Sequence, residues 1–128
     1  MLLAERIGQL PKDVVIVPLP TVASHVRVRG YDHTLLIAKG VAKAQRLRLE
    51  KALYRRTSTT QRGEGRKTRQ RQAKEAFGVK GTLNSAATYL LIDDVVTTGA
   101  TLQCGAKALK DAGAGEVWVA ALAYHPLD

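Results

Sequence analysis

The 128-residue sequence predicts an α/β domain with a mostly parallel sheet that has helices on both faces. Three apolar, strand-like runs at residues 13–20, 87–96 and 116–124 alternate with helical patterns at residues 33–47 and 100–113. Strands that alternate with helices favour a parallel sheet, because each parallel connection must cross over a face of the sheet. The length suits one compact domain, so residues 1–128 are expected to form a single unit.

The composition is that of a globular protein without a disulfide framework. Apolar residues make up 45% of the chain, which is ordinary for a domain with a core. The single cysteine, Cys104, excludes internal disulfides and a cysteine-rich zinc site. Glu5 and Arg6 interrupt the apolar start, so no signal peptide is expected, and no apolar run reaches the roughly 18 residues of a membrane span. These features predict a cytoplasmic protein that does not cross a membrane.

Positive charge is concentrated in the first part of the chain. Residues 1–80 hold 18 Lys and Arg against 6 Asp and Glu, a balance of +12, whereas residues 81–128 hold 2 against 5, a balance of −3. The formal net charge of +9 favours anionic partners such as phosphates, nucleotides or nucleic acid. Residues 55–75 contain one apolar residue, Ala73, so they are expected to form an exposed loop.

The remaining segments are assigned from their periodicity and their turn residues. A short helical stripe at residues 2–10 ends at Pro11, and residues 21–31 have the Ser, Gly and charged residues of a loop. The helix at residues 100–113 has Leu102, Ala106 and Leu109 on one face, and Gly113 is expected to cap its C-terminus.

Two adjacent carboxylates lie near the end of the second strand-like run, in the stretch YLLIDDVVTTGAT at residues 89–101. Ligands of parallel α/β sheets bind beyond the carboxyl ends of the strands, where Asp93 and Asp94 are expected. The next helix should begin near Ala100 or Thr101, and its first N–H groups form an anion site that Gly99 lets a phosphate approach. A ribose 5-phosphate would suit both parts of this pattern. Its phosphate would bind at the start of the helix, and its hydroxyls or a hydrated Mg²⁺ would bind the two carboxylates.

Parts of this pattern also occur in proteins without such a site. Two carboxylates can be a cap and a solvated charge, and T-T-G can be an ordinary turn. A Walker B carboxylate also ends an apolar strand, but the chain has no G-x-x-x-x-G-K-[ST] motif. A phosphate receiver domain needs a further aspartate and a catalytic lysine, and only Lys107 and Lys110 follow, both on the expected helix. Because the two acids and T-T-G occur together between a predicted strand and a predicted helix, a phosphate site is the favoured interpretation.

The same stretch resembles the thirteen-residue signature with which type I phosphoribosyltransferases bind phosphoribosyl pyrophosphate (PRPP): an apolar strand, two acids and T-T-G-x-T. VPLPTVASHVRVRGYDH at residues 17–33 and TSTTQRGEGRKTRQRQAKEAF at residues 57–77 resemble the ComF/GntX-like branch of that family. The resemblance covers roughly residues 14–123 and implies a type I phosphoribosyltransferase-like core. The chain departs from the branch's usual pattern at Asp32, His33 and Gln72, and the branch's usual cysteine-rich N-terminal segment is not among these residues.

The resemblance implies roles for the matching positions. Asp93 and Asp94 would be the catalytic and metal-binding residues, holding the ribose hydroxyls directly or through Mg²⁺. The other PRPP-binding residues would be Val95 and the turn that wraps the 5-phosphate, Thr97, Thr98, Gly99, Ala100 and Thr101. The pyrophosphate side would be formed by Leu19, Pro20, Thr21, Arg27 and Arg29. The flexible loop that closes over the site would contain Gln61, Arg62, Arg66, Lys67 and Arg69.

The implied reaction is the transfer of a phosphoribosyl group from PRPP to a small nitrogenous acceptor, with release of pyrophosphate. Mg²⁺ and guanidinium groups would stabilise the leaving pyrophosphate, and a closed loop would exclude water. Little sequence remains to build a hood that grips a base, so the acceptor stays open.

A second class of function also stays open, namely a module that senses PRPP or a nucleotide, or that binds nucleic acid, as the resemblance to a branch associated with DNA uptake in competence implies. Residues 55–75 contain no aromatic side chain on which bases could stack, which favours non-specific phosphate attraction. A homodimer is also open, because Trp118 and Tyr124 are expected either to pack in the core or to form a subunit contact. His25, His33 and His125 lack metal-ligand spacing, and only His33 is expected near the site.

Overall fold

The computed structural model of the chain describes residues 10–20, 32–56, 77–96 and 99–124. A four-stranded sheet forms the centre of this part of the molecule, and its strand pairs are all parallel. In spatial order its strands are β2 (Arg48–Leu49), β1 (Val14–Pro18), β5 (Thr88–Val96) and β6 (Glu116–Tyr124). The predicted parallel α/β class is confirmed.

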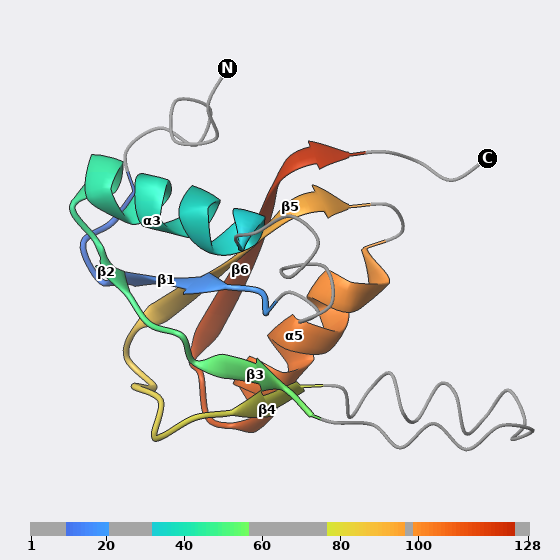
Figure 1. Cartoon of the computed structure of the whole chain (residues 1–128). Coiled ribbons are helices and arrows are strands. Elements are labelled where there is room, and N and C mark those ends of the chain that lie inside the picture. The colour runs from blue at the N-terminus through green and yellow to red at the C-terminus, as the bar shows by residue number, and fades with distance from the viewer. Residues whose placement is uncertain (1–9, 21–31, 57–76, 97–98, 125–128) are drawn as a thin grey trace, which may run out of the picture.

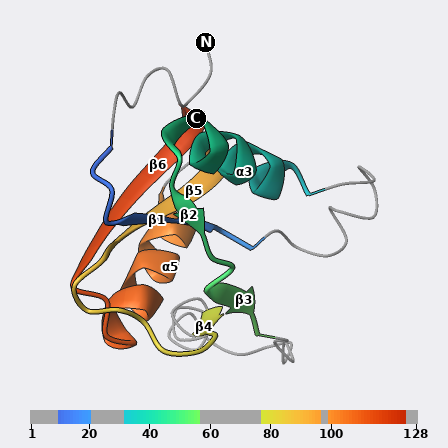
Figure 2. The same ribbon diagram turned by 90° about the vertical axis from the view of Figure 1, so that its left-hand side faces the viewer.

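Two helices connect these strands and lie on opposite faces of the sheet (Figures 1 and 2). Helix α3 (His33–Gln45) follows β1 and leads to β2, and helix α5 (Ala100–Asp111) joins β5 to β6. The first connection steps outward from β1 and the second steps outward from β5 in the opposite direction. Because such crossovers are right-handed, opposite steps place the two helices on opposite faces, as expected from the alternating sequence pattern.

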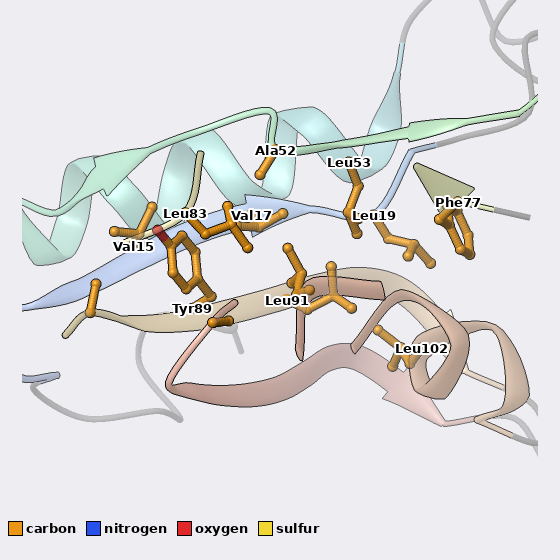
Figure 3. Close-up of a cluster of buried hydrophobic side chains, with 13 residues drawn as sticks. Val15, Val17, Leu19, Ala52, Leu53, Phe77, Leu83, Tyr89, Leu91 and Leu102 are labelled. Atoms are coloured by element: carbon orange, nitrogen blue, oxygen red, sulfur yellow. The ribbon is translucent and has the colours of Figure 1, made fainter. Parts of the chain in front are cut away.

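The alternation of side chains along β5 divides the core into two layers. Leu90 and Ile92 pack with α3, whereas Tyr89 and Leu91 face the layer that α5 covers (Figure 3). All four are buried. The hydroxyl of Tyr89 accepts a hydrogen bond from the backbone N–H of Asn84 at 2.7 Å, so this phenol is buried with its polar atom satisfied. The continuous apolar run in the sequence therefore corresponds to a strand that is covered on both sides.

Helix α3 is capped at both ends, and it is two residues shorter than the predicted helix at 33–47. Asp32 is the N-cap, and its Oδ1 accepts a hydrogen bond from the N–H of Leu35 at 3.1 Å. Arg46 ends the helix in the left-handed conformation, with φ 56°. The N–H of Leu47 then donates to the carbonyl of Ala42 at 2.8 Å, which satisfies a terminal carbonyl while the chain turns toward β2.

Helix α5 begins and ends where glycines allow the backbone to turn. Gly99, with φ 81°, is its N-cap, so the helix begins at Ala100 as the sequence predicts. At the other end the cap is Ala112 and not Gly113, the cap that the sequence predicts; Gly113 follows it with φ 110°. The N–H of Gly113 donates to Lys110 and that of Ala114 to Leu109, which is the hydrogen-bond pattern of a Schellman motif.

Three short strands are not predicted from the sequence. Besides β2, they are β3 (Leu53–Arg55) and β4 (Phe77–Val79), which pair antiparallel as a separate two-stranded sheet. The sequence predicts Arg55 in the exposed loop 55–75, but it is the last residue of a strand. Two or three residues are too few to show a periodic pattern, and these strands depend on pairing partners that are distant in sequence.

The rest of the predicted segments lie outside the described residues: the helix at 2–10 except for Leu10, the loop at 21–31, and residues 57–76 of the exposed segment. Among the helices that the structure does describe, none is long and apolar enough to span a membrane.

Candidate functional site

The candidate site lies where β1 and β5 run side by side and their connections leave in opposite directions. This arrangement is a topological switch point, and the crevice outside the carboxyl ends of such strands is the usual ligand site of open α/β sheets. The turn after β1 stays against β5, because the N–H of Leu19 donates to the carbonyl of Ile92 at 2.8 Å. Asp93 and Asp94 follow Ile92 directly, so the two carboxylates stand just beyond the end of β1.

The two aspartates are not the last residues of their own strand. β5 continues to Val96 through its pairing with β6, in which Asp93 lies opposite Ala121 and Val95 lies opposite Ala123. The strand-like run predicted at 87–96 likewise includes both aspartates, so the pair lies near the end of the strand and two residues, Val95 and Val96, follow it. The partner strand β1 stops earlier, however, so within the described residues β5 has no strand partner on that side at the aspartates.

The carboxylate of Asp93 is half-buried and has two donors from the chain itself. Its Oδ1 accepts the backbone N–H of Asp94 at 2.8 Å and lies 3.5 Å from the hydroxyl of Thr34, which is a buried residue in the first turn of α3. Burial raises the pKa of Asp93 to about 6, helped by the neighbouring Asp94 and opposed by the hydrogen bonds from the Asp94 N–H and Thr34. The site therefore holds a partly desolvated carboxylate that a cation or hydroxyl donors would stabilise in its charged form.

Asp94 stands beside Asp93, and 22% of its side chain is exposed. Its Oδ2 lies 3.9 Å from Nδ1 of His33, the first residue of α3. The prediction that His33 lies near the site is therefore confirmed. Thus the N-terminal turn of α3 contacts both carboxylates, His33 next to Asp94 and Thr34 next to Asp93.

The phosphate-binding half of the predicted site is described in part. Gly99 caps α5 in the left-handed conformation without a side-chain hydrogen bond, and Ala100 and Thr101 form the exposed first turn. The N-terminus of α5 carries partial positive charge that suits an anion. Thr97 and Thr98 lie outside the described residues, as does the side chain of Val95.

The turn after β1 buries its leucine side chain in the core. Leu19 is buried in the layer that α5 covers, among the side chains shown in Figure 3. A Cβ on Gly105 of α5 would lie only 2.9 Å from Leu19 Cδ1, so this helix approaches the turn closely because it has a glycine there. Thr21, Arg27 and Arg29 lie outside the described residues.

Arg55 is a site residue that the sequence analysis missed. Its Nε donates to the carbonyl of Pro20 at 2.8 Å, and its guanidinium lies 5.0 Å from the ring centroid of Phe77, its partner across the hairpin. Partial desolvation lowers the pKa of Arg55, whereas the charge of Asp93 acts in the opposite direction. Arg55 therefore links the turn after β1 to the β3–β4 strand pair, and its charge interacts with that of Asp93.

One signal in the sequence could have separated Arg55 from the arginines that follow it. It comes directly after Ala52, Leu53 and Tyr54, an apolar run of strand character that precedes the basic segment. The predicted loop residues, Gln61, Arg62, Arg66, Lys67 and Arg69, lie outside the described residues. Within the described part of the chain, no three His, Cys, Asp or Glu side chains form a cluster for a metal ion.

Comparison with known proteins adds one curated relative. No family model matches the chain. Competence protein F of Haemophilus influenzae is 31% identical over 124 residues, which are 94% of this chain and 54% of that protein. The chain thus spans about half the length of the curated relative that it matches.

Several solved structures share the fold. The allosteric regulatory enzyme of purine biosynthesis matches with a TM-score of 0.64 and 19% identity, over 93% of this chain and 23% of that one. Purine phosphoribosyltransferase from Pyrococcus horikoshii has a TM-score of 0.58 and 20% identity, over 97% and 76%. Adenine phosphoribosyltransferase from Trypanosoma brucei, solved with AMP, pyrophosphate and ribose 5-phosphate, has a TM-score of 0.52 and 17% identity, over 92% and 47%.

At these identities the structural matches establish the fold, and the sequence match establishes the relationship to a competence protein. Both agree with the motifs at residues 17–33, 57–77 and 89–101. The chain is a homologue of competence protein F, with the fold of the type I phosphoribosyltransferases, as its ComF/GntX-like motifs predicted.

Proposed function

We propose that the crevice binds PRPP with Mg²⁺ and that the chain transfers the phosphoribosyl group to a nitrogen atom of a small acceptor, releasing pyrophosphate. The observation that carries this proposal is the Asp93–Asp94 pair, which lies just beyond the end of β1 and precedes helix α5 in the chain. The proposal is supported by the fold, which the chain shares with purine and adenine phosphoribosyltransferases.

The two aspartates suit the sugar and the metal ion. Carboxylates accept hydrogen bonds from vicinal hydroxyls and are the ligands that Mg²⁺ prefers in proteins. The raised pKa of Asp93 fits this role, because the donors present in the chain do not fully offset the cost of burying its charge. The N-terminus of α5 would hold the 5-phosphate at the other end of the sugar.

Arg55 suits the pyrophosphate side of the same crevice. Arginine has five N–H donors in a fixed fork, so the bond from Nε to Pro20 leaves donors that can reach phosphate oxygens. In the proposed reaction the bond from C1 of the ribose to the pyrophosphate oxygen breaks, and a bond from C1 to the acceptor nitrogen forms. Negative charge then collects on the pyrophosphate, where a guanidinium stabilises it and bound Mg²⁺ would add Lewis-acid stabilisation.

The proposal is tested by incubating the full chain with Mg²⁺, PRPP and a panel of purine and pyrimidine bases and amines. Pyrophosphate release and the mass of the new N-phosphoribosyl product are measured together. One acceptor should give both products, and Asp93→Asn and Asp94→Asn should lower the rate. Binding of PRPP without any product would favour a sensing module, and the absence of both binding and turnover would contradict the proposal.

A second candidate function is non-specific binding of nucleic acid linked to DNA uptake. The relative's name, competence protein F, and the +12 balance of residues 1–80 favour it. Binding through charge alone should weaken steeply as salt rises and should not depend on sequence. Anisotropy of labelled single-stranded DNA at several salt concentrations checks this, and salt-insensitive, sequence-selective binding would make this candidate the primary one.

A further inference from the structure

Large apolar side chains are exposed on β6, at one margin of the sheet. Among the described residues five large hydrophobic side chains are exposed, and three of them belong to this strand: Trp118 (36% exposed), Val119 (52%) and Leu122 (42%). Trp118 lies opposite Leu90 and Val119 opposite Leu91 in the pairing with β5. Trp118 and Leu122 therefore point to the face of α3, and Val119 points to the face of α5.

The outer edge of β6 has no strand partner within the described part of the chain. β6 pairs with β5 on one side and is the last strand of the four-stranded order (Figure 2). Long edge strands are normally protected from pairing by charges, prolines or bulges. β6 has nine residues, no proline, and a single charged residue, Glu116 at its start, whose carboxylate accepts a hydrogen bond from Trp118 Nε1 at 3.0 Å.

The charge distribution allows a second copy of the chain to approach this edge. The positive charge lies in residues 1–80, whereas residues 81–128 carry a balance of −3. The charged side chains of the adjacent helix α5 have partners within the chain, since Lys107 pairs with Asp111 at 3.1 Å and Lys110 donates to the carbonyl of Gly115 at 2.9 Å. Contact through β6 would bring few like charges together, because Glu116 is the single charged residue of this strand.

We propose that β6 pairs antiparallel with β6 of a second copy, around a two-fold axis through Ala120. In this register all nine residues of the strand have a partner, Trp118 lies opposite Leu122, and Val119 lies opposite Ala121. A two-fold axis at Val119 would place Leu122 opposite Glu116, and one at Ala121 would leave Glu116 and Val117 without partners. The strand is thus most complementary to itself at Ala120.

The resulting dimer has a continuous eight-stranded sheet. The strands of each copy are parallel to one another, but the two β6 strands run in opposite directions. The carboxyl ends of the strands therefore lie at one end of the dimer in one copy and at the other end in its partner. The paired strand contains none of the candidate site residues, so dimerisation requires neither PRPP nor catalysis. The inference is therefore independent of the proposed function.

Sedimentation of the full chain over a range of concentrations tests the proposal. The parent should show a monomer–dimer equilibrium, and Leu122→Lys and Trp118→Lys should each weaken the dimer at least about tenfold. Leu36→Lys is the matched control, because Leu36 is also an exposed apolar residue (53%) but lies on α3. It should leave the equilibrium unchanged. A parent that stays monomeric, or a dimer insensitive to both β6 variants, would overturn the proposal.

Disulfide trapping tests the register. Ala120→Cys, in a Cys104→Ser background, places two thiols opposite each other across the axis, within the Cα separation that a disulfide tolerates. Mild oxidation should yield a covalent dimer. Val119→Cys, whose opposite residue is Ala121, and Lys39→Cys on the exposed side of α3 should not give one. A dimer that cross-links through Val119→Cys or Lys39→Cys but not through Ala120→Cys would contradict the proposed pairing.

Discussion

Removal of the Asp93 charge should stabilise the ligand-free protein at neutral pH. Burial raises the pKa of Asp93 from 3.8 to about 6, so the folded state binds this proton more tightly than the unfolded state does. Below about pH 4 the carboxyl is neutral in both states and costs nothing. As the pH rises through about 6, the folded state loses stability because it must hold a partly desolvated charge.

The size of the effect follows from the shift. About two pKa units correspond to roughly 3 kcal/mol. The side chain is only half-buried, so solvent screening reduces the expected effect to about 1 kcal/mol. Asp93→Asn keeps the Oδ1 acceptor for Thr34 and for the N–H of Asp94 but removes the charge. Its free energy of unfolding should therefore exceed that of the parent by about 1 kcal/mol at pH 7–8 and should match it near pH 4.

Urea unfolding of the ligand-free parent and variant between pH 4 and 8 measures this difference. Asp13→Asn is the control, because Asp13 is an exposed residue in the turn before β1. It should show no comparable rise in stability with pH relative to the parent. If Asp93→Asn is no more stable than the parent at pH 7–8, or if the difference does not change with pH, Asp93 is not a destabilising buried charge and the inference of a poised cation or hydroxyl site loses its physical basis.

Two further pairs of substitutions, each a test and its control, examine the packing and the candidate site. Gly115→Ala should lower the free energy of unfolding by about 1–3 kcal/mol, because the new Cβ would collide with the backbone carbonyl of Ser85. Gly40→Ala is the control, because its Cβ would enter open space on α3, and it should raise the free energy of unfolding by up to about 1 kcal/mol. Chemical unfolding of both variants measures the difference. Arg55→Met should weaken the binding of PRPP or pyrophosphate about tenfold, as measured by calorimetry, whereas Arg56→Met, a change at the neighbouring exposed arginine, should not. If Arg55→Met binds either ligand as tightly as the parent does, Arg55 is not part of the site.

Much of the fold could be predicted because its main elements carry local signals. The apolar residues of the runs at 13–20 and 87–96 form strands that are covered on both faces, and such strands are continuously apolar in sequence. Gly99 and Gly113 mark the limits of α5 because both adopt positive φ, which glycine tolerates best. By contrast, β2, β3 and β4 have two or three residues each and form only through distant pairing.

The candidate site could likewise be predicted only in part from the sequence. Asp93, Asp94 and Gly99 could be found because they are contiguous in one motif. Arg55 and Thr34 could not, because each reaches the crevice from another element: Arg55 from the hairpin through Pro20, and Thr34 from the first turn of α3. The pKa of Asp93 likewise depends on burial, which the sequence does not reveal. The apolar character of Trp118 suggests either the core or a subunit contact, and only its exposure on an edge strand distinguishes the two.

Calorimetric titration of Mg²⁺–PRPP into the parent, Asp93→Asn and Asp94→Asn tests the central claim most directly. Each charge-assisted hydrogen bond from a ribose hydroxyl to an aspartate should contribute about 1.5–3 kcal/mol. The parent should bind, and each variant should bind roughly ten- to hundredfold more weakly, with its fold intact by thermal melting. If the parent does not bind PRPP, or if both variants bind it as the parent does, the crevice beside Asp93 and Asp94 is not a PRPP site.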